Sequence, residues 1–267
     1  MKKLFLDLGK QPIANGFIEG EPPKDEFFFD LKVVFDEDTK LVSLAEFVKP
    51  ELMFNDSYVY VSSMSQTMRT HFTNTANSLK ERFSPTKVLE IGKQDLIFSA
   101  NCMCHIQDLD DAFTAIKALL SDDGVFVFED PALDKMIERN SYDQIYDEHA
   151  HIFSVTALKN ILNNNGLDIF RVDNLSVHGG TNRLYVKHKN NNKFSIQTSV
   201  DLNLQREQEL GLKKYSTYIK FAEKVKQSKS DLVNLLDTLK KQGKKIVSYG
   251  ATSKSTTVFN YCGITTD

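Results

Sequence analysis

The ten residues from Tyr142 to His151 hold two tyrosines, three carboxylates and two histidines. No other stretch concentrates so many side chains that can move a proton. A histidine such as His149, placed beside Glu148, can act as a general base whose neighbour orients the ring and tunes its pKa. The composition therefore indicates proton transfer at His149. A solvated acidic turn is the alternative that composition leaves open.

A metal site is a second interpretation of the same stretch. His149 and His151 are separated by one residue, which is not the i, i+4 helical spacing of a His-Glu-x-x-His site, and no further ligand cluster stands out. We therefore expect no metal. Three cysteines are too few for a disulfide framework or a four-ligand zinc site, and we interpret them as small buried hydrophobes: Cys102, Cys104 and Cys262.

A helix is expected directly after this stretch. Ser154 is a good N-cap, and Leu158, Ile161 and Leu162 recur at helical spacing before Gly166 ends the pattern. The reactive side chains should therefore lie in a loop that enters a helix. Loops held by a rigid scaffold are where catalytic groups tend to lie.

The scaffold is expected to be an α/β sheet. Residues 88–91, 95–101 and 125–129 have the pattern of buried strands, and residues 109–120 have that of a helix. Alternating strands and helices predict a mostly parallel, doubly wound, Rossmann-like sheet. Ligands bind beyond the carboxyl ends of such strands, where several polar or small residues fall: Glu90, Gly92, Asn101, His105 and Glu129.

Three parts of the chain differ in pattern. Residues 1–55 predict a small β-rich module with a hairpin formed by 27–35 and 41–44. Residues 56–200 carry the sheet, which ends in a strand pair, 167–172 and 183–187, as in class I methyltransferases. In residues 201–267 we expect a long helix, then a strand near 245–249 and a helix start that open a second, truncated Rossmann-like unit.

The overall composition excludes some classes of function. The 267 residues are 41% hydrophobic and 26% charged, with a net charge of -3 and a pI near 6.1. This is typical of a globular protein and offers no basic field for nucleic acid. No apolar run reaches the roughly 18 residues that span a membrane, and the first residues do not lead into a signal-peptide core. We expect a cytoplasmic monomer that binds neither nucleic acid nor membrane.

Seven blocks, in this order, resemble the S-adenosylmethionine-dependent sugar C-methyltransferases, which methylate C3 of nucleotide-linked 4-keto deoxysugars. The resemblance covers nearly the whole chain and implies S-adenosylmethionine as cofactor and a nucleotide-linked sugar as substrate. The blocks are residues 8–15, 58–63, 88–92, 100–106, 142–149, 178–183 and 249–254.

The resemblance implies a role for each candidate residue. His149 would remove the proton on the carbon next to the keto group, and Glu148 would orient it. Tyr146 and His105 would hydrogen-bond the keto oxygen as enolate charge develops. The remaining candidates would contact the cofactor (Glu90, Gly92, Asn101, Tyr58, Tyr60 and Ser63) or the nucleotide-sugar (His178, Gly179, Gly180 and Arg183).

Three departures from the family pattern are expected to matter. The N-terminal module lacks the paired Cys-x-x-Cys zinc ligands of the family. Between Gly92 and Asp95, Lys93 and Gln94 stand in place of about 60 residues of the cofactor-binding region, if each βα unit takes about 30. Most of the C-terminal domain is expected to be missing after Asp267. The alternative function is accordingly an inactive or truncated remnant that retains only nucleotide-sugar binding.

Overall fold

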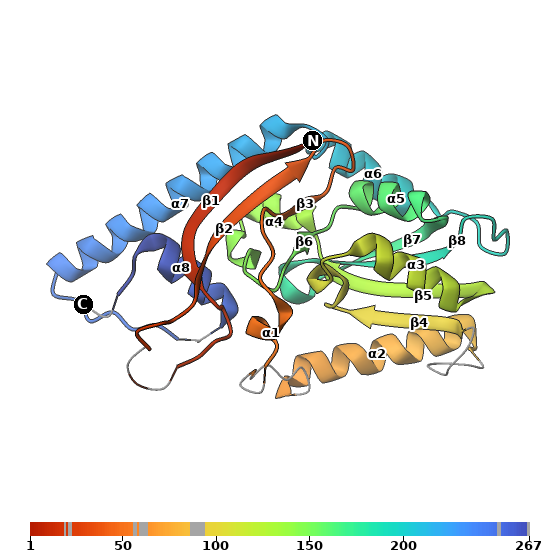
Figure 1. The fold of residues 1–267 in the computed structure, drawn as a ribbon, viewed down its shortest axis with the longest axis horizontal. Helices are drawn as coiled ribbons and strands as arrows, with labels where there is room; N and C mark the ends of the chain where they lie inside the picture. Colours follow the sequence, from red (N-terminus) through yellow and green to blue (C-terminus); the bar gives the residue numbers. More distant parts are fainter. Residues whose placement is uncertain are drawn as a thin grey trace.

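The structure, a computed structural model, describes residues 1–18, 20, 23–55, 58, 64–85, 94–249 and 252–265. In this part of the chain, two four-stranded sheets lie next to each other, with helices around them (Figure 1). The strand order is β1-β2-β3-β6 in one sheet and β4-β5-β8-β7 in the other. The fold is therefore α/β with a β-rich N-terminal module, as the sequence predicts.

The N-terminal sheet is antiparallel throughout. Its β2–β3 hairpin is the predicted one, with Val33 opposite Leu44 and a turn that places Lys40 at φ 66°. The first strand is a long element that the sequence analysis did not anticipate. The last strand pairs His151 with Ser43, so the N-terminal module holds the end of the reactive stretch. The strands are β1 (Lys2–Pro12), β2 (Phe28–Asp36), β3 (Val42–Leu44) and β6 (His151–Ile152).

The second sheet is mixed, which corrects the expectation of a mostly parallel sheet. Within it, β4 and β5 run parallel, whereas β8 is antiparallel to both β5 and β7. The reason is the short turn η4, which joins β7 directly to β8 and so reverses the chain. The antiparallel β7–β8 pair itself was predicted. The elements are β4 (Gln94–Ala100), β5 (Leu120–Pro131), β7 (Leu167–Leu175), η4 (Val177–Gly179) and β8 (Thr181–His188). The predicted strand 88–91 lies outside the described residues.

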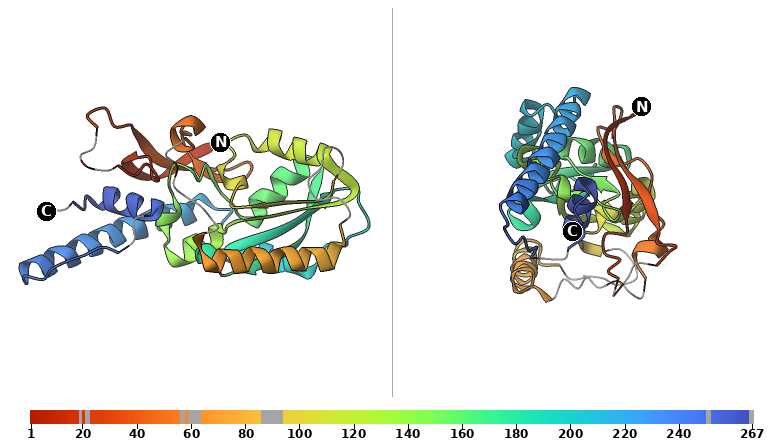
Figure 2. Two further views of the ribbon diagram at one scale, coloured as in Figure 1. Left: turned by 90° about the horizontal axis from the view of Figure 1, so that it is seen from below. Right: turned by 90° about the vertical axis from the view of Figure 1, so that its left-hand side faces the viewer.

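Helices cover both faces of this sheet. Figure 2 shows α2 on one side and α3 with α5 on the other. Alternating residues of β5 separate the two cores, because Val125 and Val127 pack toward α2 whereas Phe126 and Phe128 pack toward α3 and α5. Ser154 caps α5, as expected, and Ser65 caps α2. The helices are α2 (Gln66–Phe83), α3 (Leu109–Leu119), α5 (Val155–Asn164) and α6 (Thr198–Glu209), the last of which packs on β7.

The C-terminal helices pack on the N-terminal sheet. The single long helix expected in the first part of residues 201–267 is two helices, because the chain turns at Gly211 with φ 75°. The far end of α7 extends beyond both sheets (Figures 1 and 2). The elements of this region and the short helices near the reactive stretch are α1 (Pro50–Met53), η2 (Met103–His105), α4 (Leu133–Arg139), η3 (Tyr142–Gln144), α7 (Tyr215–Lys241) and α8 (Ser253–Cys262).

The strand expected near 245–249 does not form. Residues 244–249 have no regular structure, and Ile246 and Val247 are 42% and 78% exposed. A strand needs a hydrogen-bonded neighbour, and no described strand pairs with this segment. The helix that was expected to follow does form as α8. Among the helices that the structure describes, none combines the length and the apolar character needed to cross a membrane.

Candidate active site

The reactive stretch is buried, which contradicts the interpretation as a solvated acidic turn. From Tyr142 to His151 every residue except Asp143 is buried. Contacts from both ends of the chain help to hold the stretch in place: the Thr257 hydroxyl of α8 donates to the Ile145 carbonyl at 2.8 Å, and the amide of Ala14 donates to the Asp147 carboxylate at 3.0 Å. The N-terminal module and the C-terminal helix thus enclose the loop between them.

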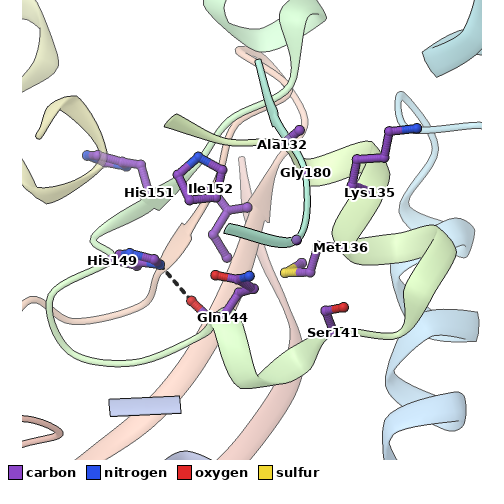
Figure 3. A pocket seen from close by; sticks show the side chains of 11 residues that line it. Ala132, Lys135, Met136, Ser141, Gln144, His149, His151, Ile152 and Gly180 are labelled. Carbon is purple, nitrogen blue, oxygen red and sulfur yellow. Dashed lines mark hydrogen bonds between the residues drawn. The ribbon is translucent and has the colours of Figure 1, made fainter. Parts of the chain in front are cut away.

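His149 is oriented by a backbone carbonyl. Its Nδ1 lies 2.7 Å from the Gln144 oxygen, as Figure 3 shows, and its Nε2 lies 2.8 Å from the Tyr146 hydroxyl. Because a carbonyl can only accept, we assign the proton to Nδ1, so that Nε2 accepts from Tyr146. Burial, with the neighbouring His105, lowers the pKa of His149 to about 3. Burial raises the pKa of Tyr146 well above its ordinary value. A neutral imidazole therefore faces a protonated phenol.

His105 lies across from His149. The centroids of the two rings are 5.4 Å apart, and the His105 ring also stacks on Phe54 with a centroid distance of 5.9 Å. Burial lowers the pKa of His105 to about 4, so this ring is neutral as well. The structure thus brings together three of the four predicted catalytic residues.

Glu148 has other partners, which corrects its expected role. Its carboxylate accepts hydrogen bonds from the Tyr58 hydroxyl at 2.9 Å and from the side-chain amide of Asn15. Asn15 belongs to the N-terminal module and Tyr58 follows it in the chain, so Glu148 is bound to this part of the molecule. The Gln144 carbonyl orients His149 instead. Burial raises the pKa of Glu148, although the hydrogen bonds from Asn15 and Tyr58 oppose this shift.

A Cys-His group lies at the same place. The side chains of Cys104, His105 and His149 each offer one ligand atom, and these atoms lie within 4.8 Å of one another. The structure therefore corrects the expectation that the chain lacks residues able to bind zinc. Cys104 and Cys262 are buried, as predicted, whereas Cys102 is exposed, which corrects the interpretation for that cysteine. The His149-His151 pair considered from the sequence does not form such a group among the described residues.

Asn101 and His178 come together from two predicted sites. Asn101 follows β4 with φ 49°, and its side-chain amide lies 3.3 Å from Nε2 of His178. Its backbone amide donates to the Glu129 carbonyl at 2.7 Å, which places it at the carboxyl ends of β4 and β5. A predicted cofactor residue thus touches a predicted substrate residue. Four further cofactor candidates lie outside the described residues: Glu90, Gly92, Tyr60 and Ser63.

Arg183, predicted to contact the nucleotide-sugar, is held in a buried cluster with Glu129 and α2. Its Nε donates to Glu129 at 2.6 Å, and a second guanidinium nitrogen donates to the Thr75 hydroxyl of α2 at 2.5 Å. His71 of α2 lies 2.6 Å from the other oxygen of Glu129. The guanidinium is held in this buried cluster because Glu129 needs a partner away from water. Its structural effect is to hold α2 on the sheet.

A small pocket adjoins His149 (Figure 3). Its cavity volume is about 10 Å³, room for one water molecule. Gly180, with φ 124°, lies so close to α4 that an added Cβ would be 2.6 Å from Cγ of Lys135. Predicted substrate residues and the predicted base thus line one cavity, together with residues of β5, α4 and β6: Pro131, Ala132, Lys135, Met136, Ser141, Gln144, His149, His151, Ile152, Gly179 and Gly180.

Three residues near the site were missed from the sequence. Gln144 acts through its carbonyl, which residue type does not reveal. Asn15 and Lys254 belong to blocks that carry the family resemblance, and this was the only signal for them. Lys254, at the start of α8, is electrostatically coupled to His149 and His178. Burial lowers its own pKa.

Comparison with protein families shows three matches along the chain. A model described as a methyltransferase domain matches residues 35–172. A model described as a C-methyltransferase C-terminal domain matches residues 176–267. A model of a zinc binding domain matches residues 1–54, which contain neither cysteine nor histidine. The Cys-His group lies outside that last range.

A curated relative shares part of the sequence. C-methyltransferase NovU of Streptomyces niveus is 27% identical over 173 residues, which are 65% of this chain and 41% of that protein. The chain thus matches less than half the length of this relative.

Two solved methyltransferase structures resemble parts of the chain weakly. Magnesium protoporphyrin IX methyltransferase from Synechocystis, with bound SAH, has 15% identity and a TM-score of 0.29, covering 36% of this chain and 45% of that one. An S-adenosylmethionine-dependent methyltransferase from Clostridium acetobutylicum has 17% identity and a TM-score of 0.30, covering 46% and 72%. Superpositions this poor support no argument about the site.

The family matches correct the expectation of an incomplete architecture. The sequence suggested a chain without zinc ligands, without part of the cofactor region and without most of the C-terminal domain. Instead, all three models match, and a Cys-His group is present. Since the methyltransferase domain matches 138 of the 267 residues, the chain belongs to the S-adenosylmethionine-dependent methyltransferase family, and its second part matches the C-terminal domain of C-methyltransferases.

Proposed function

We propose that this chain transfers a methyl group from S-adenosylmethionine to a carbon next to the keto group of a nucleotide-linked sugar. One observation carries the proposal: His149 is held through Nδ1 by a carbonyl, with its unprotonated Nε2 directed to Tyr146 and His105 across from it. The name of the relative, C-methyltransferase, and the seven sequence blocks support the same chemistry.

Methylation at carbon requires a nucleophilic carbon, and removing a proton next to a carbonyl produces one. Nε2 of His149 accepts that proton, while the Gln144 carbonyl stabilises the imidazolium through Nδ1–H. The enolate oxygen needs a donor, which the protonated Tyr146 hydroxyl or the N–H of neutral His105 provides. S-adenosylmethionine, when bound, supplies the electrophilic methyl group.

The low pKa of His149 sets a requirement on the substrate. A base with a pKa of about 3 is always unprotonated at neutral pH, but it is a weak proton acceptor. An anionic group bound nearby favours the imidazolium and raises this pKa. The diphosphate of a nucleotide-sugar is such a group, so binding of the substrate would itself raise the pKa of His149.

The described residues fit the polar contacts of both ligands. We propose that Asn101 and Tyr58 contact S-adenosylmethionine, because Asn101 lies at the carboxyl end of β4, where such sheets bind ligands. His178, Gly179 and Gly180 would contact the nucleotide-sugar. Glu90, Gly92, Tyr60 and Ser63 keep their predicted role at the cofactor. A cavity of about 10 Å³ is far below the several hundred Å³ of ligand sites, so substrate binding has to widen it.

Hydrogen exchange tests the base separately from the methyl donor. A nucleotide-linked 4-keto deoxysugar is incubated with the protein in deuterated buffer without S-adenosylmethionine, and deuterium at C3 is followed by NMR. We expect His149→Asn to slow this exchange by roughly 10² to 10⁴. His188→Asn is the matched control, since His188 also contacts a carbonyl, that of Leu120, away from the site.

Two results would contradict the proposal. Undiminished exchange in His149→Asn would show that another group is the base. If the unaltered protein binds the sugar nucleotide but catalyses no exchange, the proposed reaction is contradicted.

A further inference from the structure

We propose that the ammonium group of Lys254 binds the diphosphate of the nucleotide-linked sugar and so holds the sugar with C3 at His149. This inference rests on the proposed function, from which it takes the class of substrate. In such a sugar the diphosphate is attached to C1, only two carbons from C3. A group that binds the diphosphate therefore has to lie close to His149 and to the loop at His178.

The contacts of α8 place the start of this helix at the reactive loop. Thr257 donates to the Ile145 carbonyl at 2.8 Å, and the hydroxyl of Ser253 hydrogen-bonds Tyr146. Lys254 precedes Thr257 by three residues, so the two side chains lie on the same face of the helix. Lys254 is therefore on the side of α8 that packs against the loop, and it is half-buried.

The charge of Lys254 acts on both of the histidines that the substrate has to approach. Burial is the largest cause of the low pKa of His149 and of the lowered pKa of His178, and the charge of Lys254 lowers both pKa values further. Because electrostatic effects weaken with distance, the ammonium group has to lie near each of the two rings. An anion at Lys254 is thus close to the base and to the substrate loop at once.

Two donors at this position have no acceptor among the described residues. The ammonium group of Lys254 forms no hydrogen bond or ion pair there; burial lowers its pKa, and the charge of Asp143 opposes the shift without an ion pair. The side-chain nitrogen of Asn101 can only donate, so Nε2 of His178 accepts from it at 3.3 Å and Nδ1 carries the proton. A half-buried cation and an N–H group that both lack acceptors favour an anionic ligand.

Binding of the diphosphate at Lys254 also prepares the base. In the free protein the charge of Lys254 disfavours protonation of His149, and a bound diphosphate neutralises that charge. His149 thus becomes a stronger base when the substrate is in place. A free keto sugar has no diphosphate, leaves the charge of Lys254 uncompensated and is therefore a poor substrate.

Binding of nucleotides without a sugar tests Lys254 separately from the reaction. The full chain is titrated in a calorimeter with uridine diphosphate and uridine monophosphate, and with the two thymidine nucleotides, and the pair that binds more tightly is used for the variants. We expect the unaltered protein to prefer the diphosphate. Lys254→Met should weaken diphosphate binding by about 10- to 100-fold and remove most of this preference. A merely structural effect would weaken both nucleotides equally.

Two further variants serve as controls. Lys254→Arg keeps the charge and should retain most of the affinity for the diphosphate. Lys229→Met removes the same charge from another half-buried lysine, whose Nζ lies over the ring of Tyr261 near the other end of α8, 4.4 Å from the centroid. This variant should bind the diphosphate like the unaltered protein. Far-ultraviolet circular dichroism checks that each variant is folded.

Four results would overturn the proposal: no binding of either diphosphate to the unaltered protein, unchanged affinity in Lys254→Met, equal losses for diphosphate and monophosphate in that variant, and an equal loss in Lys229→Met. These titrations contain no keto sugar, so they do not depend on proton abstraction. If Lys254 is needed for diphosphate binding but C3 does not exchange, only the proposed function is contradicted.

Discussion

At the scale of single residues, burial decides which groups around His149 carry a charge. Asp147 is 2% exposed, with Oδ1 accepting the Ala14 amide and Oδ2 lacking a partner among the described residues. Burial raises its pKa to about 7, although the hydrogen bond from Ala14 opposes the shift. Its charged form is therefore disfavoured in the folded protein up to neutral pH.

Asp147→Asn should make the protein relatively more stable as the pH rises. The folded pKa of about 7 exceeds the ordinary 3.8, so the contribution of Asp147 to stability is present below pH 4 and is lost as the pH rises through 7. Asparagine keeps an oxygen for Ala14 and does not titrate. We expect the free energy of unfolding of the variant, minus that of the unaltered protein, to increase by about 1 kcal/mol per pH unit between pH 4 and 7.

His151 provides a control of opposite sign in the same loop. Burial lowers its pKa to about 4 from the ordinary 6.5, so its contribution to stability is present above pH 6.5 and is lost as the pH falls toward 4. His151→Gln should thus gain relative stability as the pH falls. Urea unfolding at several pH values measures both variants. Parallel slopes for the two would show that their pKa values are not shifted in opposite directions.

Residue type predicted part of the site and not the rest. The His149-Tyr146 pair and His105 were expected from their chemistry and from the family blocks, and the fold brings them together. The orienting carbonyl of Gln144 could not be expected, since every residue has one. The Cys104 group depends on a contact across about 45 residues of sequence, which the spacing of cysteines and histidines does not encode.

At the scale of elements, α8 holds the reactive loop from outside. Thr257 of α8 is 1% exposed and donates to the Ile145 carbonyl at 2.8 Å, and Thr256 donates to the Ala14 carbonyl at 3.1 Å. One short helix thus links the N-terminal module to the loop that carries His149. Loss of these contacts should destabilise both the N-terminal module and the loop that carries His149.

Thr257→Val should destabilise the protein by about 1–3 kcal/mol, because the nearly isosteric valine leaves the buried Ile145 carbonyl without its donor. The measurement is the urea midpoint and slope. Thr238→Val is the control, since Thr238 donates to the Asn234 carbonyl of its own helix on the exposed part of α7. Equal losses in the two variants would mean that the bond from α8 is not what stabilises the loop.

The attachment of α2 depends on a buried ion pair. Glu129 and Arg183 lie 2.6 Å apart, at 1% and 9% side-chain exposure, and each also contacts α2. Removing one partner leaves a buried charge, so Arg183→Met should cost about 3–5 kcal/mol. The double variant Glu129→Met, Arg183→Met should cost less than the sum of the single variants, as a double-mutant cycle in urea will show. Additive costs would contradict a direct interaction.

Elements with local signals were predicted well, and those that depend on distant partners were not. The β2–β3 hairpin, α5 behind its Ser154 cap and the β7–β8 pair follow from turn residues and periodicity. The position of β8 between β5 and β7 depends on pairing that no local pattern reveals. The sequence of residues 244–249 has the pattern of a strand. A strand also needs a neighbouring strand to pair with, which the local pattern does not provide.

At the scale of the whole molecule, the two sheets meet at the site. β6 belongs to the N-terminal sheet, although it lies between α4 and α5 in the chain, next to the helices that cover the other sheet. The domain boundaries predicted at residues 55 and 200 stay predictions. The end of the reactive loop pairs with the N-terminal sheet through β6.

The segment 244–249 is exposed along its whole length, so a protease can reach it. Lys244 and Lys245 lie in it, so trypsin should cleave there first and generate a fragment that begins at Ile246 and contains α8. Limited digestion followed by mass spectrometry identifies this cut. A fragment with a single ten-residue helix is not stably helical alone, so only its contacts with β1, α7 and the reactive loop can retain it.

If the contacts of Thr256 and Thr257 are sufficient, the two pieces will co-elute in native gel filtration and separate in urea. Dissociation in native buffer would show that covalent linkage is needed. A retained fragment would mean that the protein can be reconstituted from two pieces. The peptide that contains α8 and contacts the His149 loop could then be synthesised with a label and exchanged for the original fragment.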